Sequence, residues 1–339
     1  MIKRIANRLL DVAFIPLLTP LWLQRCNGQV TVFLYHRVDH LGEHDFLDSG
    51  GSPTISPSEL ESDLRFLKDN KFEFLTFKDI STCRFESDKR YAVITFDDGF
   101  ASVYNAGATI AEQLNIPITV FQCSAMISGK EPLWEHLLYW IDSHATVKTQ
   151  FMQWIQKSDH KVATAVAEND DAVSELSQSL ISGLARQQYT MAQLQLCINK
   201  FMAAHPEVEA ASREQITRLY PNHEQIKHAM ASAHEVGSHG EHHYRRDSLT
   251  DGEFERELEN SKKGLEKITG CNIESYSYPF NSYFQRDEAV CAQYFKYVGT
   301  VDGGRIMRTS RPTSLPRNTH PGSAKNRLRQ ARWLLTGKI

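Results

Sequence analysis

The sequence has no CxxC cysteine pair and no strong charge of either sign, and both absences limit what the protein can do. Its six cysteines are widely scattered, which is typical of unpaired thiols rather than of a disulfide framework or a thiolate zinc site. This favours a reducing compartment. The formal net charge is only -3 over 339 residues, so the chain lacks the basic field that holds nucleic acid through its phosphates. We therefore expect no nucleic-acid partner.

Long uninterrupted hydrophobic runs are also missing. Residues 1–29 start basic and continue apolar, but Asp11, Pro16 and Pro20 interrupt the run and no small-x-small cleavage site follows. The segment 323–339 interleaves arginine with leucine and tryptophan. These two helical ends either lie on an anionic membrane surface or pack against the domain. A cytoplasmic location is slightly favoured over one associated with the inner membrane.

Strand and helix signals alternate along most of the chain. Ser56 precedes Pro57 and Glu59, a capping box that predicts a helix over 57–69, and Thr250 with Glu253 opens another that ends near Gly270. A polar, Gln- and Ala-rich stretch at about 137–222 predicts a helical insertion. Strands are expected at 30–36, near 74, at 91–96, 117–122, 235–237, 275–279, 296–301 and 313–316, with a further helix at 102–114. The pattern predicts one α/β domain over 30–322, a parallel sheet or barrel.

Chemically active side chains follow three of the predicted strands. Asp97 and Asp98 end the run 91–96, His36 follows VTVFLY, and His239 and His243 follow the strand at 235–237. In a parallel α/β fold the carboxyl ends of the strands face one side of the sheet, so we expect these groups to converge.

Two histidines and one carboxylate leave open positions on a divalent ion, which is the ligand count of a hydrolytic site. Neighbouring residues leaving a strand point in different directions. One aspartate of the pair can therefore bind metal while the other acts as a base.

The segments TFDDGF and HGEHH together resemble motifs of the polysaccharide deacetylase family, carbohydrate esterase family 4, whose shared domain is named after the nodulation-factor deacetylases. This resemblance implies a deformed (β/α) barrel with the helical stretch as an insertion. It further implies that Asp97 is the catalytic base and that Asp98, His239 and His243 bind the metal.

The later motifs match less closely. SYSYPFNSY resembles the third family motif, with Pro279 and Phe280 in place, but Ser277 stands where the family has an arginine that steadies the base. That task is left unassigned. The resemblance also implies that a backbone N–H near Phe280 completes an oxyanion site. Gly240 replaces the hydroxyl residue that usually follows the first histidine.

The segment LYHRV resembles the exopolysaccharide-associated branch of the family, whose fold begins with a strand that other members carry at the end. There the histidine takes the general-acid role, which makes His36 the candidate acid and His320 the reserve. His36 can alternatively be a structural histidine at a strand end.

The function expected from the resemblance is a metal-dependent hydrolase that removes N-acetyl groups from amino sugars of a polysaccharide or lipid-linked oligosaccharide. A metal-bound water would attack the amide carbonyl, and the cofactor would be zinc, with cobalt or nickel as alternatives. Two other hypotheses stay open: a catalytically silent carbohydrate-binding relative, and a hydrolase of the same fold that acts on another amide or ester.

Overall fold

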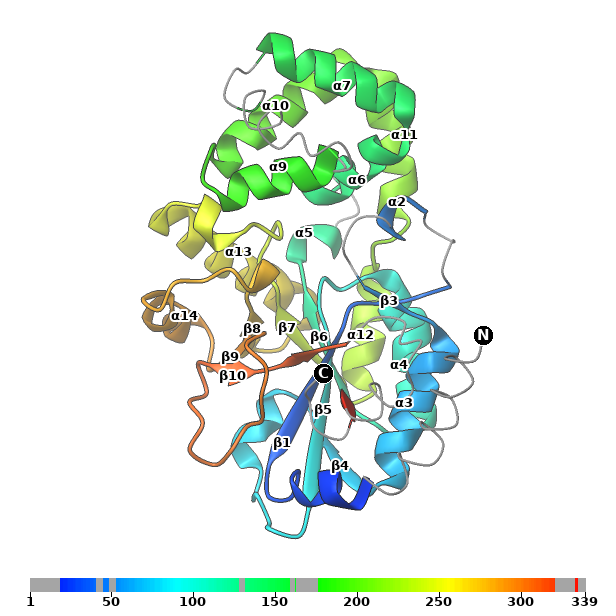
Figure 1. The fold of residues 1–339 in the computed structure, drawn as a ribbon, viewed down its shortest axis with the longest axis vertical. Coiled ribbons are helices and arrows are strands. Elements are labelled where there is room, and N and C mark those ends of the chain that lie inside the picture. Colours follow the sequence, from blue (N-terminus) through cyan, green and yellow to red (C-terminus); the bar gives the residue numbers. More distant parts are fainter. Residues whose placement is uncertain are drawn as a thin grey trace, which may run out of the picture.

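A parallel sheet that curls into a nearly closed barrel forms the centre of the barrel domain, below the group of helices in Figure 1. The computed structural model describes residues 19–40, 45–48, 53–127, 132–158, 162, 176–320 and 333–334. Within these ranges the strand order is β10-β9-β8-β7-β6-β5-β1-β11, with β4 beside β5. The strands are β1 (Val30–Tyr35), β4 (Phe72–Leu75), β5 (Arg90–Phe96), β6 (Ile118–Gln122), β7 (Glu235–Ser238), β8 (Ser275–Ser277), β9 (Tyr297–Thr300), β10 (Leu315–Pro316) and β11 (Asn318–Thr319).

A single short segment closes this sheet into a deformed barrel. β10 and β11 are separated only by Arg317, yet β10 pairs with β9 at one end of the strand order and β11 pairs with β1 at the other. The predicted strand 313–316 is thus β10, and β11 was not predicted because two residues are too few to give a pattern. The predicted strand 275–279 ends earlier, at Ser277, because Pro279 begins a 3₁₀ turn, η4 (Pro279–Asn281).

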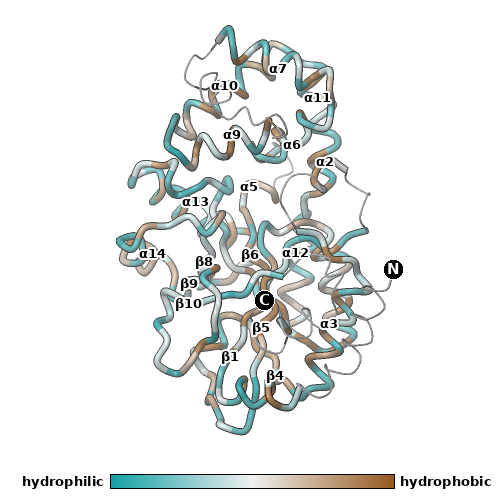
Figure 2. Tube along the Cα trace, viewed as in Figure 1, coloured by the Kyte–Doolittle hydropathy of each residue, from teal (hydrophilic) through white to brown (hydrophobic). Residues whose placement is uncertain are grey.

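Helices cover the outside of the barrel. They are α3 (Pro57–Asp69), α4 (Ala108–Gln113), which continues a π-helical turn η2 (Val103–Gly107), α12 (His223–Ala231), α13 (Asp251–Thr269) and α14 (Asp287–Tyr294). Both predicted capping boxes are confirmed, at Ser56 and Thr250, and Gly270 ends α13 in the left-handed conformation. In Figure 2 hydrophobic residues follow the central strands, while the surrounding helices show mixed colours.

Strand alternation places side chains on two different sides of the sheet. Along β5, Ala92 and Ile94 belong to the large core beneath the helices, whereas Tyr91 and Val93 belong to a smaller cluster inside the barrel. Asp97 is an even number of residues away from Tyr91 and Val93 and therefore faces the same side of the sheet. The first aspartate after β5 therefore continues the inward-facing row.

A group of helices lies over one end of the barrel, at the top of Figure 1. These are α6 (Trp134–Ser143), α7 (Ala145–Ser158), α9 (Leu176–Ala185), α10 (Met191–Ala204) and α11 (Pro206–Thr217), which we call the helical insertion. They follow β6 and the short α5 (Ser124–Ile127) and precede α12 and β7. No strand occurs in the described parts of 132–222, as the composition predicts.

Several smaller elements complete the described chain. β2 (Arg37–Val38) and β3 (Thr54–Ile55) form a separate two-stranded sheet, and α2 (Asp45–Asp48), η1 (Lys78–Thr82) and η3 (Arg246–Ser248) are short. Most of the two predicted terminal segments, 1–18, 323–332 and 335–339, lies outside the described residues. Trp22, Cys26 and Trp333 are described and buried in the core. In the described part of the chain, no helix combines the length and the apolar composition that a membrane span needs.

Candidate active site

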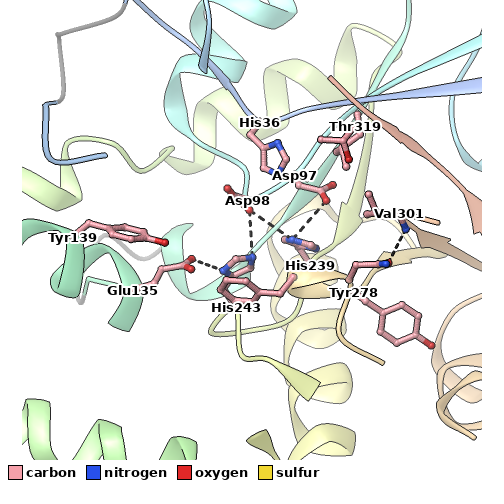
Figure 3. Close-up of a pocket in the computed structure, with 13 residues that line it drawn as sticks. His36, Asp97, Asp98, Glu135, Tyr139, His239, His243, Tyr278, Val301 and Thr319 are labelled. Carbon is pink, nitrogen blue, oxygen red and sulfur yellow. Dashed lines mark hydrogen bonds and ion pairs between the residues drawn. The ribbon is translucent and has the colours of Figure 1, made fainter. Parts of the chain in front are cut away.

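The predicted site residues meet in one cavity of about 240 Å³ (Figure 3). His36 enters it from the end of β1, Asp97 and Asp98 from the end of β5, and His239 and His243 from the segment after β7. The convergence predicted from the strand ends is therefore present in the structure. The cavity is also lined by Leu34, Glu135, Tyr139, Tyr278, Phe280, Asn281, Val301 and Thr319.

Local backbone geometry explains the Asp-Asp-Gly sequence at the end of β5. Asp98 and Gly99 both have positive φ, 68° and 85°, a conformation that turns the chain sharply out of the strand. A Cβ at Gly99 would lie 2.2 Å from Oε1 of Gln122, so a larger residue would have to displace that buried side chain and also adopt the positive φ. Gln122 ends β6, and its backbone carbonyl accepts a hydrogen bond from the N–H of His239 at 2.9 Å. The ends of β5, β6 and β7 are thus tied together.

Three buried side chains have the geometry of a metal site. Nε2 of His243 lies 3.4 Å and Nε2 of His239 lies 3.6 Å from Oδ1 of Asp98. Ligand atoms bound at about 2.0–2.1 Å to a tetrahedral Zn²⁺ are roughly 3.3 Å apart, so these separations fit one ion. Nδ1 of His239 donates to the carbonyl oxygen of Ser277 at 2.8 Å, which leaves its Nε2 lone pair directed at the cluster.

The charges around these ligands favour a cation between them. Burial lowers the pKa of His239 to about 4, against the opposing effect of Asp97, so its imidazole is neutral as a ligand must be. Burial would also lower the pKa of His243, but the carboxylates of Glu135 and Asp98 outweigh it and raise the pKa to about 9. These carboxylates stabilise positive charge at the ring, and an ion bound there would displace its proton. Burial raises the pKa of Asp98, yet the nearby histidines, His243 first, bring it below its ordinary value.

Asp97 is held by an arginine that the sequence analysis missed. Nη1 and Nη2 of Arg317 donate to Oδ1 and Oδ2 of Asp97 at 2.6 and 2.8 Å, and Ser277 Oγ lies 3.3 Å from Oδ2. Burial alone would raise the pKa of Asp97, but Arg317 and then His239 bring it well below the usual range. The side chain is an ionised carboxylate with a fixed orientation. Arg317 thus occupies the place, beside Asp97, of the arginine that the third motif lacks.

His36 lies above the two aspartates in Figure 3. Its Nδ1 atom is buried and has no hydrogen-bond partner in the part of the chain that the structure describes. The reserve candidate, His320, does not line the cavity: its ring stacks on Tyr35 with centroids 5.1 Å apart, and Nε2 lies 3.6 Å from Asp63 Oδ2. The geometry therefore favours His36 over His320 as a group that reaches the cavity.

Phe280 contributes both its ring and an unusual backbone to the cavity wall. Its φ is 56°, and its ring centroid lies 4.6 Å from that of the metal-ligand candidate His243. Arg245 stands 5.3 Å from the Phe280 ring centroid on a cation–π contact. The assignment of an oxyanion-binding N–H to this residue stays a prediction.

Glu135 and Tyr139 are further residues that sequence reasoning did not single out. Both come from α6 of the helical insertion, one turn apart, and Figure 3 shows them on the same side of the cavity. Residues four apart share one helix face, so an amphipathic pattern places them together, but nothing local indicates which surface that face meets.

The chain resembles polysaccharide deacetylases in sequence. A family model described as polysaccharide deacetylase matches residues 85–294. The putative polysaccharide deacetylase YxkH of Bacillus subtilis (strain 168) is 24% identical over 120 residues, which cover 34% of this chain and 40% of that relative. The chain thus matches less than half the length of this curated relative.

Two solved structures share the fold at low sequence identity. The Streptococcus pyogenes deacetylase PplD, solved in complex with acetate, has a TM-score of 0.56 at 12% identity, covering 88% of this chain and 96% of that one. IcaB from Ammonifex degensii has a TM-score of 0.54 at 16% identity, covering 91% and 97%. At these sequence identities the two structures show that the barrel fold is shared.

Proposed function

The chain belongs to the polysaccharide deacetylase family, and from this premise we propose that it is a metal-dependent hydrolase that removes N-acetyl groups from amino sugars. The observation that carries the proposal is the cluster of Asp98, His239 and His243 with a second carboxylate, Asp97, directly beside it. A purely structural metal site has no need of that additional, separately held carboxylate.

Asp98 and the two histidines would hold the ion, which we propose to be zinc, with cobalt or nickel as alternatives. When bound, such an ion lowers the pKa of water and polarises a carbonyl oxygen. The protein side chains carry the remaining steps. Asp97, fixed by Arg317, accepts the proton of the attacking water, and His36 donates a proton to the departing amine. The backbone near Phe280 would face the oxygen of the scissile carbonyl.

We propose an N-acetylated polysaccharide or lipid-linked oligosaccharide as the substrate. Two facts support this choice: the family membership, and the shared fold with IcaB and with a deacetylase solved with acetate, the small product of such a reaction. We also propose, from the sequence alone, that the terminal segments contact a membrane peripherally and that the protein is cytoplasmic.

Metal stoichiometry tests the site without knowledge of the glycan. Purified wild-type protein loaded with Zn²⁺ should retain about one ion per chain, and His239→Ala should retain none, since one of three ligands is gone. A wild-type protein that cannot be loaded with zinc, cobalt or nickel would contradict the proposal and support the silent carbohydrate-binding relative.

Acetate release from N-acetylated amino-sugar oligomers tests the reaction. The wild type should release acetate, and Asp97→Asn should bind metal normally but lose at least about 10²-fold in rate, because the amide cannot accept the proton. Full activity of Asp97→Asn would contradict the assignment of the base. Metal-loaded wild type that cleaves only other amides or esters would support the remaining alternative.

A further inference from the structure

A buried carboxylate from the helical insertion lies against one of the candidate metal ligands. Oε1 of Glu135 contacts Nδ1 of His243, the ring nitrogen opposite the one that faces Asp98 (Figure 3). Glu135 is only 4% exposed and is the second residue of α6. A carboxylate in the first turn of a helix is stabilised by the N-terminal end of the helix dipole.

The charge of Glu135 is not balanced by a lysine or an arginine within the described ranges. Among the described residues the ring of His243 contacts its carboxylate most closely, and Nε2 of His136, whose pKa burial lowers to about 3, lies 3.9 Å from Oε1. Burying a carboxylate without a partner is costly. Because no lysine or arginine of the described ranges pairs with Glu135, a histidine has to serve as its partner. Of the two histidines, His243 makes the closer contact, and its ring is therefore the partner that compensates the burial of Glu135.

The backbone of His243 also requires support. Its φ is 57°, a left-handed conformation that a non-glycine residue keeps only where its surroundings hold it. Trp134, the neighbour of Glu135, donates from Nε1 to the carbonyl oxygen of His243 at 3.3 Å. From the barrel side, Glu257 on α13 accepts the N–H groups of Glu241 and His242, both at 2.9 Å.

We propose that Glu135 is a positioning residue that orients the imidazole of His243 for metal binding, so that the helical insertion is part of the metal centre. This inference rests on the proposed function only in taking His243 as a ligand. A carboxylate held against one ring nitrogen favours the tautomer that carries its proton on that nitrogen, and it makes the other nitrogen a better ligand. The first turn of α6 holds the ring through Glu135 and the backbone through Trp134.

The first turn of α6 is itself anchored to the far end of the insertion. Tyr220, three residues beyond α11, accepts the N–H of Leu133 at 2.7 Å, and its hydroxyl lies 2.9 Å from Nδ1 of His136. Both junctions of the insertion therefore meet beside Glu135. This bracing gives α6 the fixed position that a residue acting on a metal ligand needs.

Metal affinity of the folded protein tests the proposal. Full-length wild type, Glu135→Gln and Glu135→Ala are titrated with Zn²⁺ against a chelating indicator, and the Co²⁺-loaded forms are compared by visible absorption. Loss of such a partner costs about 10–100-fold in metal affinity, so we expect that loss for Glu135→Ala, a smaller one for Glu135→Gln, and an altered Co²⁺ spectrum for both. The matched control is Glu207→Gln, at the second position of α11 and exposed, which should bind metal as the wild type does.

The outcomes separate this inference from the proposed function. Wild-type affinity and an unchanged Co²⁺ spectrum in both Glu135 variants would overturn the positioning role while leaving the metal site intact. A wild type that binds no metal would overturn the proposed function, and the inference with it. If Glu135→Ala is unfolded by circular dichroism, the isosteric Glu135→Gln decides the question, because a fold-only role predicts weaker stability of the metal-free protein with unchanged affinity.

Discussion

At the scale of single residues, Asp97 depends on a partner that is distant in sequence. The third motif has Ser277 where the family resemblance leads one to expect an arginine, and Arg317, 220 residues after Asp97, forms a two-pronged contact with that carboxylate. Arg317 is fully buried and also donates to Ser277 Oγ. Ser277 and Arg317 thus form one arrangement around the proposed base.

Replacing this arginine with lysine should reduce catalysis without removing metal. Lysine keeps the charge but presents a single ammonium, so Arg317→Lys cannot hold both oxygens of Asp97 in place. We expect the rate of acetate release to fall by about 10²-fold, with metal content unchanged, because a small misplacement of a reacting group has an effect of that size. The measurement is kcat together with the amount of bound zinc. If metal-loaded Arg317→Lys had the wild-type rate, the two-pronged contact of Arg317 with Asp97 would not be needed for catalysis.

At the scale of elements, local signals predicted most helices and strands but not how they meet. The capping boxes located α3 and α13 because Ser56 and Thr250 bond to residues only three positions away, so the interaction can be recognised in a short stretch of sequence. The metal-ligand candidates were found from the strand ends and from the family resemblance, both of which depend on short stretches of sequence. The position of α6 depends on contacts with Tyr220 and His243, which no local pattern contains.

Tyr220→Phe tests this bracing of the insertion. Removing the hydroxyl leaves the buried N–H of Leu133 and the Nδ1 atom of His136 without this partner. An unsatisfied buried polar group costs about 1–3 kcal/mol, so the free energy of unfolding in urea should fall by roughly that amount. Tyr294→Phe removes an exposed hydroxyl bonded to Glu255 and is the control, with little expected change. Equal stabilities of the two variants would show that the Tyr220 hydroxyl does not brace α6.

At the scale of the whole molecule, the α/β class could be predicted from alternation, whereas barrel closure could not. Closure depends on Leu315–Pro316 and Asn318–Thr319 pairing with strands at opposite ends of the order. The first lies in the predicted strand 313–316, but the second is too short to give a pattern, and neither pairing is contained in local sequence. Arg317 lies between them, so the segment that closes the barrel also delivers the partner of Asp97. The sequence could not predict that Arg317 pairs with Asp97, because this contact, like the barrel closure, joins positions far apart in the chain.

Whole-molecule stability should decline in mild acid because of His136. Burial lowers the pKa of His136 to about 3, compared with about 6.5 in an unfolded chain. As the pH falls below about 6.5, the unfolded chain binds a proton at this residue that the folded protein does not. The free energy of unfolding must then decrease, by up to about 1.4 kcal/mol per pH unit, until the pH approaches 3.

His136→Gln should remove this contribution while keeping an acceptor for the Tyr220 hydroxyl. Urea unfolding at a series of values between about pH 6 and pH 4 should give a shallower decline for the variant than for the wild type, by roughly 1 kcal/mol per pH unit. The same substitution at the exposed His223 is the matched control. Parallel pH profiles of wild type and His136→Gln would mean that the buried ring takes up its proton in the folded state, and that the first turn of α6 is open to water.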